Sequence, residues 1–198
     1  ELSNHYNAII SSDTNPPAVN YCNNRLSILE NGTFTLASES GNKKINNSIK
    51  VQSLGGAWEL FFREGQGAPA RIIFPELISW TENDNQAIKY FSGIVKYQKI
   101  FQYDINSVYG KGWKIFLDLG ELSKIADVRL NDNRLGVAWT KPFRFDVTDI
   151  LKNGDNILTV EIANTWSSRL TGDALTGQNS THTNLRTTNK AGLNKIQV

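Results

Sequence analysis

The chain has 198 residues, and its 39% hydrophobic content is enough to build one apolar core. Its 21 basic and 19 acidic residues do not gather into blocks of either sign, so the charge pattern argues against a nucleic-acid partner. The single cysteine excludes an internal disulfide, and because the two histidines lie far apart in sequence, no structural zinc is expected. No apolar run approaches the roughly 18 residues of a membrane span, so no membrane helix is expected.

Residues 1–30 are polar, contain the pair Pro16-Pro17 and an asparagine-rich stretch, and show no apolar periodicity. This composition is typical of an N-terminal arm or linker. We therefore expect residues 31–198 to form a single domain. Methionine is absent even at position 1, which indicates a removed signal or a piece of a longer protein.

From about residue 32 onward, apolar residues recur at every second position, which predicts β-strands with one buried face. Turn residues that tolerate positive φ separate these runs, as in "NGT" at 31–33, "NDN" at 131–133 and "NGDN" at 153–156. Two packed sheets bury all such faces most simply, so the sequence predicts an all-β protein with a β-sandwich. The alternating runs are Trp58, Leu60 and Phe62; Val95, Tyr97 and Phe101; Trp113, Ile115, Leu117 and Leu119; Ala126, Val128 and Leu130; Leu135, Val137 and Trp139; Phe143, Phe145 and Val147; and Leu158, Val160 and Ile162.

Two further features are expected towards the C-terminus. The segment "TDILK" favours one helical turn capped by Thr148, with Ile150 and Leu151 closing one end of the sandwich. After Asn164 the alternation stops, so a long polar loop is expected, with "LNKIQV" at 193–198 as a possible last strand.

Catalytic chemistry has little support in the sequence. His5 lies in the expected arm and His182 in the polar loop, so neither suits a Ser-His-Asp triad. Glycoside hydrolysis needs two carboxylates, one with a raised pKa, but no pair stands out among the acids that alternate with core positions. These acids are Asp118, Glu121, Asp127, Asp146, Asp149, Glu161 and Asp173.

Carbohydrate binding has better candidates. Sugars stack on flat aromatic rings and hydrogen-bond to planar carboxylate, amide or guanidinium groups. Trp139, Trp166, Arg169, Asp173 and Tyr90 offer such groups near the ends of expected strands. Four of them have a structural alternative: Trp139 has the parity of a core residue, Trp166 could cap the core, and Arg169 and Asp173 could form an ion pair that holds the loop. Tyr90 precedes an expected strand and is freer to reach a ligand.

Three segments, "GAWELFF", "YFSGIVKYQKIF" and "IFLDLGELSKIADVRLNDNRLGVAWTKPFRFDVTDILKNGDNILTVEIANTW", carry a resemblance in their order and spacing. Over residues 54–173 the chain resembles the jelly-roll, galactose-binding-domain-like sandwich of glycoside hydrolases. This sandwich occurs in the family-two β-galactosidase and β-glucuronidase group and in multidomain bacterial α-L-rhamnosidases. The stretch "NTWSSRLTGD" is most similar to the C-terminal sandwich of the rhamnosidases.

The resemblance implies a non-catalytic domain that recognises carbohydrate or walls the cleft of a secreted or periplasmic glycoside hydrolase, with the catalytic barrel elsewhere in a longer chain. Its implied partners are carbohydrate and that catalytic domain. By analogy with the β-galactosidase group, Asp173 with Arg169 becomes the best candidate for a sugar contact. The alternative is a structural module that packs between domains without binding sugar. Related sandwiches often carry calcium, but the sequence has no D-x-D-x-D loop, so no cofactor is expected.

Overall fold

The computed structural model describes residues 6–11, 19–22, 25–38, 41–107 and 113–177. The chain divides into two compact units, Glu1–Ser53 and Leu54–Val198. The candidate residues of the sequence all lie in the second unit. The two histidines and the segment 193–198 lie outside the described residues.

The first unit is built on strand pairing. Strands β1 (Tyr6–Ser11), β4 (Gly32–Ser38) and β5 (Lys43–Asn47) form a three-stranded sheet in the order β1-β4-β5, and β2 (Val19–Cys22) pairs with β3 (Arg25–Ile28). Phe34 and Leu36 of β4 are fully buried.

The first unit ends at Ser53, whereas the sequence predicts an arm that ends at residue 30. Residues of that segment form β1, which pairs with β4 across the expected boundary, as in the register Ile9↔Leu36. Backbone hydrogen bonds join these strands, so the polar composition of the segment did not reveal them.

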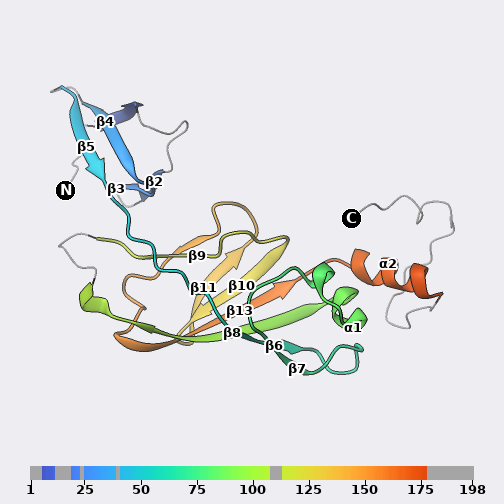
Figure 1. The fold of residues 1–198 in the computed structure, drawn as a ribbon. Helices are drawn as coiled ribbons and strands as arrows, with labels where there is room; N and C mark the ends of the chain where they lie inside the picture. Colours follow the sequence, from blue (N-terminus) through green and yellow to red (C-terminus); the bar gives the residue numbers. More distant parts are fainter. Residues whose placement is uncertain (1–5, 12–18, 23–24, 39–40, 108–112, 178–198) are drawn as a thin grey trace. The chain divides into compact units, whose positions relative to one another are not determined.

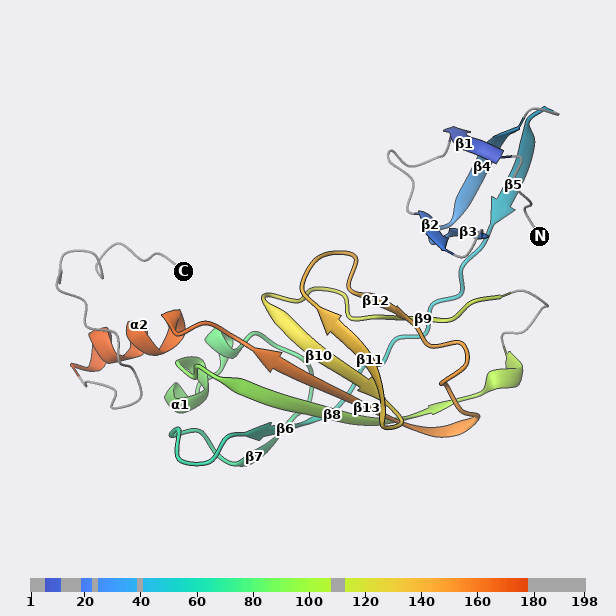
Figure 2. The ribbon, with the colours of Figure 1, turned by 180° about the vertical axis from the view of Figure 1, so that it is seen from behind.

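The second unit contains a six-stranded antiparallel sheet in the order β11-β10-β13-β8-β6-β7. A second antiparallel pair, β9 with β12, lies on one face of this sheet (Figures 1 and 2). The predicted all-β sandwich is therefore confirmed. The strands are β6 (Trp58–Phe62), β7 (Arg71–Phe74), β8 (Ile94–Tyr103), β9 (Phe116–Asp118), β10 (Ile125–Leu130), β11 (Asn133–Ala138), β12 (Arg144–Asp146) and β13 (Gly154–Ala163).

The core lies between these layers and follows the alternation of the strands. β6 and β10 bury all their predicted residues, whereas Phe101 of β8 and Ile162 of β13 are only partly buried against the core. Trp113 is an exception, because it precedes β9 and is 41% exposed. The buried core residues of the four strands are Trp58, Leu60, Phe62, Val95, Tyr97, Ala126, Val128, Leu130, Leu158 and Val160.

A β-bulge in β11 reverses the predicted orientation of its second half. Val128 pairs with Gly136 whereas Arg129 pairs with Arg134, so Leu135 is an additional residue in the strand. After the bulge Ala138 is buried and Trp139 is 72% exposed. The predicted core positions of Val137 and Trp139 are therefore wrong, because one extra residue turns every later side chain to the opposite face.

Helices are few and short: η1 (Trp80–Glu82), α1 (Gln86–Lys89), η2 (Ile105–Ser107) and α2 (Ser167–Thr176). The expected helical turn at Thr148 is a single turn, in which Ile150 and Leu151 both donate backbone hydrogen bonds to Val147 O. The long polar loop expected after Asn164 instead contains α2, so that prediction is wrong over its first part. No described helix is long and apolar enough to cross a membrane.

Candidate functional site

Several connecting segments meet at one end of the six-stranded sheet. The register pairs Phe62 with Val95 and Ala163 with both Ile94 and Ile125, so β6 and β13 end where β8 and β10 begin. The β6–β7 connection (63–70), the segment before β8 and the segment after β13 therefore converge. Figures 1 and 2 show α1, α2 and the β6–β7 connection at this end.

Asn164 joins the end of β13 to the start of β8. Its side-chain Nδ2 donates to Phe91 O at 2.8 Å, and its Oδ1 accepts from Gly93 N at 2.8 Å. Its backbone N also donates to Gly93 O at 3.2 Å. These three bonds fix the positions from which α1 and α2 extend.

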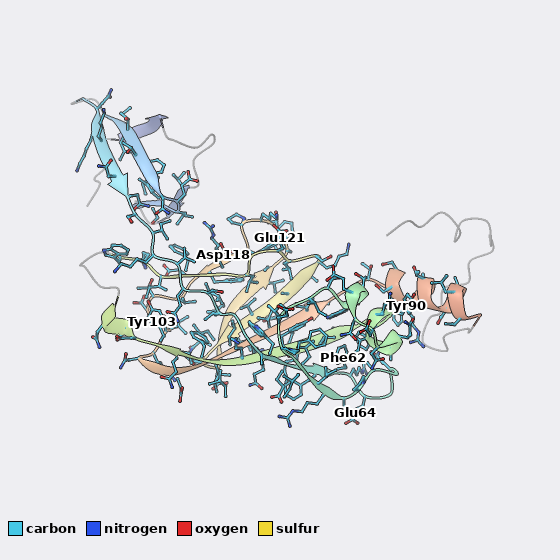
Figure 3. All side chains as sticks on the ribbon, viewed as in Figure 1. Phe62, Glu64, Tyr90, Tyr103, Asp118 and Glu121 are labelled. Carbon is cyan, nitrogen blue, oxygen red and sulfur yellow. The ribbon has the colours of Figure 1, made fainter. Side chains whose placement is uncertain are left out.

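Helix α2 is held against the same segment. Its first turn lacks a side-chain cap from Trp166, but Ser92 Oγ, which belongs to a buried residue, accepts from Arg169 N at 3.0 Å. A Cβ added to Gly172 would lie 2.7 Å from Tyr90 Cβ, so the helix backbone packs directly on Tyr90. Figure 3 shows Tyr90 beside α2.

Arg169 of α2 lies beside the β6–β7 connection, because a Cβ added to Gly67 would be 4.0 Å from Arg169 Nη1. We call Gln66, Arg169 and Asp173 the Arg169 cluster. Arg169 Nε lies 3.4 Å from Asp173 Oδ1, and their side chains are only 26% and 17% exposed. The ion pair considered as a structural alternative is therefore present. Its geometry falls outside that of a hydrogen bond, and Arg169 Nε and Gln66 Oε1 are buried atoms without a hydrogen-bond partner among the described residues.

The structure does not bring all five candidate residues together. Trp166 is 40% exposed and begins α2, so it lies at the same sheet end as the Arg169 cluster. Trp139 follows β11, which is three strands from β8 in the sheet order. At about 4.8 Å per strand, this places Trp139 roughly 14 Å from the start of β8.

Four of the acidic candidates outside the cluster lie in ion pairs. The carboxylate–cation distances are 2.6 Å for Asp118–Arg144, 3.0 Å for Glu121–Lys141, 2.7 Å for Asp127–Arg134 and 2.9 Å for Asp146–Lys114. In Figure 3, Asp118 and Glu121 lie away from α2, on the side of β9.

Two of these acids have shifted pKa values, and both shifts are downward. The hydrogen bond from Arg134 lowers the pKa of Asp127. Burial acts to raise the pKa of Asp146, but hydrogen bonds from Thr148 and Lys114 outweigh it and bring the pKa below its usual value. A general acid needs the opposite shift, so neither residue suits that role.

Sequence reasoning missed Gln66, Ser92 and Asn164. Gln66 stands between two glycines in a connection without alternation, and only its spatial neighbours mark it. Ser92 and Asn164 act over 77 and 71 residues of sequence separation respectively, so no local pattern indicates their partners. Among the described residues there is no group of three or more His, Cys, Asp or Glu side chains that could hold a metal ion.

Comparison with known proteins gives the family. The family model described as "glycosyl hydrolase 2 galactose-binding domain-like" matches residues 78–196, more than half of the chain. The chain belongs to this family. The resemblance noted in the sequence is thereby confirmed, and the sandwich is a galactose-binding-like domain.

The relatives of this galactose-binding-like domain are much longer proteins. A putative β-glucuronidase of Formosa agariphila is 41% identical over 120 residues, which are 61% of this chain and 10% of that protein. The structure of a rhamnosidase from Novosphingobium sp. PP1Y has a TM-score of 0.56 and 28% identity, covering 80% of this chain and 16% of the rhamnosidase. A Bifidobacterium dentium β-glucuronidase structure has a TM-score of 0.47 and 30% identity, covering 56% of this chain and 19% of that one. This chain thus spans between a tenth and a fifth of each relative's length.

Proposed function

We propose that this galactose-binding-like domain is a non-catalytic part of a glycoside hydrolase that recognises carbohydrate or forms a wall of the catalytic cleft. The observation that carries the proposal is the grouping of exposed Trp166 with the Arg169–Asp173 ion pair at one end of the sheet. An exposed indole at the start of the helix that carries a guanidinium and a carboxylate offers the kinds of group that suit the apolar face and adjacent hydroxyls of a sugar ring.

Family membership and the names of the relatives support a glycoside-hydrolase parent. The ion pairs of Asp118, Glu121, Asp127 and Asp146 support a non-catalytic role. The lowered pKa values of Asp127 and Asp146 support it as well. The proposal includes a secreted or periplasmic location, as for an enzyme that acts on external glycans. Turnover of aryl glycosides by the isolated chain would contradict the non-catalytic part.

Sugar binding can be tested on the isolated chain by calorimetric titration with D-galactose, L-rhamnose and D-glucuronate. We expect Trp166→Ala to weaken binding at least about tenfold, a loss of about 1.4 kcal/mol. Trp113→Ala is the matched control. Trp113 is 41% exposed and Trp166 is 40% exposed, but Trp113 precedes β9 and so does not belong to the α2 site. Equal losses from the two substitutions would argue against this site.

The cleft-wall form of the proposal needs the parent enzyme. There, Arg169→Ala should raise KM while kcat stays unchanged, because the contact would bind substrate and transition state alike. An unchanged KM would contradict it.

The structural alternative is favoured by the apolar surface at the same sheet end. Trp166 is 40% exposed, Leu170 beside it on α2 is half-buried, and both could pack against another domain. In that case Trp166→Ala should lower the thermal stability of the whole enzyme without changing KM.

A further inference from the structure

Four apolar residues form a row across the outer face of the six-stranded sheet, which is the face opposite to β9 and β12 (Figures 1 and 2). In the register of the strands, Ala163 of β13 lies between Ile94 of β8 and Ile125 of β10. Trp139 continues the row beyond β10, because the residue before Trp139 pairs with the residue after Ile125. We call Ile94, Ala163, Ile125 and Trp139 the outer row.

The side chains of the outer row point away from the core. Successive side chains of a strand lie on opposite faces, and each member of the row is next to a residue that belongs to the core or packs against it. Ile94 is 57% exposed, Ile125 is 42% exposed and Trp139 is 72% exposed. Scattered exposed apolar residues are ordinary in soluble proteins, whereas a contiguous group of them indicates an interaction site.

The surroundings of the outer row favour an apolar partner over a sugar. A sugar site adds convergent polar groups to its aromatic ring, but the residues beside Trp139 in the row are aliphatic. Two charged side chains of the next row on this face already have partners within the chain. Asp127 accepts hydrogen bonds from Arg134 at 2.9 and 2.7 Å, and Lys96 Nζ lies 4.3 Å from the centroid of the Phe61 ring.

The size of the outer row indicates a partner that is linked to this domain. An aromatic side chain offers about 150–250 Å², the other three members are smaller, and none of the four is fully exposed. The row is therefore smaller than the roughly 800 Å² per partner of a stable interface between separate proteins. A linked domain needs less area, because a short linker holds it at an effective concentration of about 1 mM. The relatives are long enough to contain such domains, since this chain spans only a tenth to a fifth of their lengths.

We propose that the outer row is the surface on which another domain of the parent glycoside hydrolase docks, through an apolar patch that covers Trp139. The inference rests on the proposed function, because it assumes that parent. It concerns a different surface from the one that Trp166 and Leu170 offer on α2. It gives Trp139 a role in the assembly of the enzyme, in place of the sugar contact that its residue type suggested.

Hydroxyl-radical labelling with mass spectrometry tests the proposal by comparing this chain with the full-length parent enzyme. The tryptic peptide 135–144 contains Trp139 as its only tryptophan, so its oxidation reports on the outer row. We expect Trp139 to be oxidised at least about tenfold more slowly in the parent. A contact with a Kd of about 0.1 mM is roughly 90% occupied at an effective concentration of about 1 mM, which gives a protection of this size.

Two substitutions on β8 separate docking from folding. In the parent, Ile94→Glu should return the oxidation of Trp139 to its rate in this chain, because burying an unpaired carboxylate costs more than so small a contact contributes. Ile100→Glu is the matched control and should leave Trp139 protected. Ile100 has the same residue type and faces the same side of the same strand, and it is 66% exposed, but it lies six residues or about 20 Å from Ile94.

Folding is checked on this chain, where neither substitution should change Tm by more than about 2 °C. If a variant does not fold, the comparison of the unaltered chain with its parent still decides the question.

The outcomes separate this inference from the proposed function. Equal oxidation of Trp139 in this chain and in the parent would overturn the docking surface, and the sugar titrations and the KM measurement would still decide the proposed function. Equal loss of protection in Ile94→Glu and Ile100→Glu would also overturn it. Protection of Trp139 in this chain by D-galactose, L-rhamnose or D-glucuronate would make the row a sugar surface instead, and protection that increases with the concentration of this chain would make it a contact between two copies. Either result would overturn the proposal.

Discussion

Replacing Asn164 by alanine should detach the end of β13 from the start of β8. The substitution removes the bonds from Nδ2 to Phe91 O and from Gly93 N to Oδ1, both 2.8 Å long, and leaves their two backbone partners without the side chain. Each hydrogen bond contributes about 1 kcal/mol net, and each buried partner left unpaired costs about 1–3 kcal/mol. We therefore expect the free energy of unfolding to fall by about 2–4 kcal/mol.

Calorimetry and amide exchange measure this effect in different ways. For a chain of this size, about 3 kcal/mol corresponds to a fall in Tm of roughly 10 °C. The Gly93 amide should also exchange faster, because its acceptor is lost. Asn153→Ala is the matched control, since Asn153 Oδ1 accepts a hydrogen bond from Ile105 N at 3.1 Å in an exposed setting. This substitution should lower the free energy of unfolding by about 0.5–1 kcal/mol. A loss below about 1 kcal/mol in Asn164→Ala, with Gly93 exchange unchanged, would refute the reasoning.

Two further predictions concern Tyr97 and Trp139. Burial raises the pKa of Tyr97 from 10.0 to about 12, against a smaller opposing effect of its hydrogen bond from Trp80. The folded state therefore favours the neutral phenol. The contribution of this group to the free energy of unfolding is complete below pH 10 and should decline by about 1.4 kcal/mol per pH unit as the pH rises towards 12. Urea unfolding measured between pH 10 and 12 should show this decline in the unaltered chain but not in Tyr97→Phe. If the free energy of unfolding fell with pH at the same rate in both chains, the burial effect would be contradicted. Because Trp139 is 72% exposed, Trp139→Ala should change the free energy of unfolding by no more than about 0.5 kcal/mol, whereas Trp58→Ala in the core should cost about 3–5 kcal/mol. A loss above about 2 kcal/mol in Trp139→Ala would restore the core interpretation.

The strands of the sandwich could be predicted because their information is local. Trp58, Leu60 and Phe62 alternate within five residues of β6, and the structure buries all three. The same holds for Val95 and Tyr97 of β8. Periodicity of this kind depends only on the pleat of a strand that is buried on one face.

The remaining features depend on contacts between distant parts of the chain. Helix α2 contains two serines, two threonines and a glycine, so its composition predicts a loop, yet Ser92 supplies a cap from 77 residues away. Gln66 has no sequence signal, since only the glycine at position 93 and the α2 arginine reveal its setting. The candidate site could therefore be predicted by residue type on α2, but not in its full membership.

The additional residue in β11 hides the two faces of this strand from a simple count of alternate positions. Before Leu135 the even and odd positions have one assignment to core and solvent, and after it they have the other. A related chain that lacks this one residue would pair an identical Val-Ala-Trp sequence with the same residues of β10, so its indole would still face outward, now with unbroken alternation along the strand. An alignment gap of a single position in this hairpin would thus leave unchanged the aromatic group that the domain presents to its surroundings, although it would change what the alternation of the sequence predicts for that group.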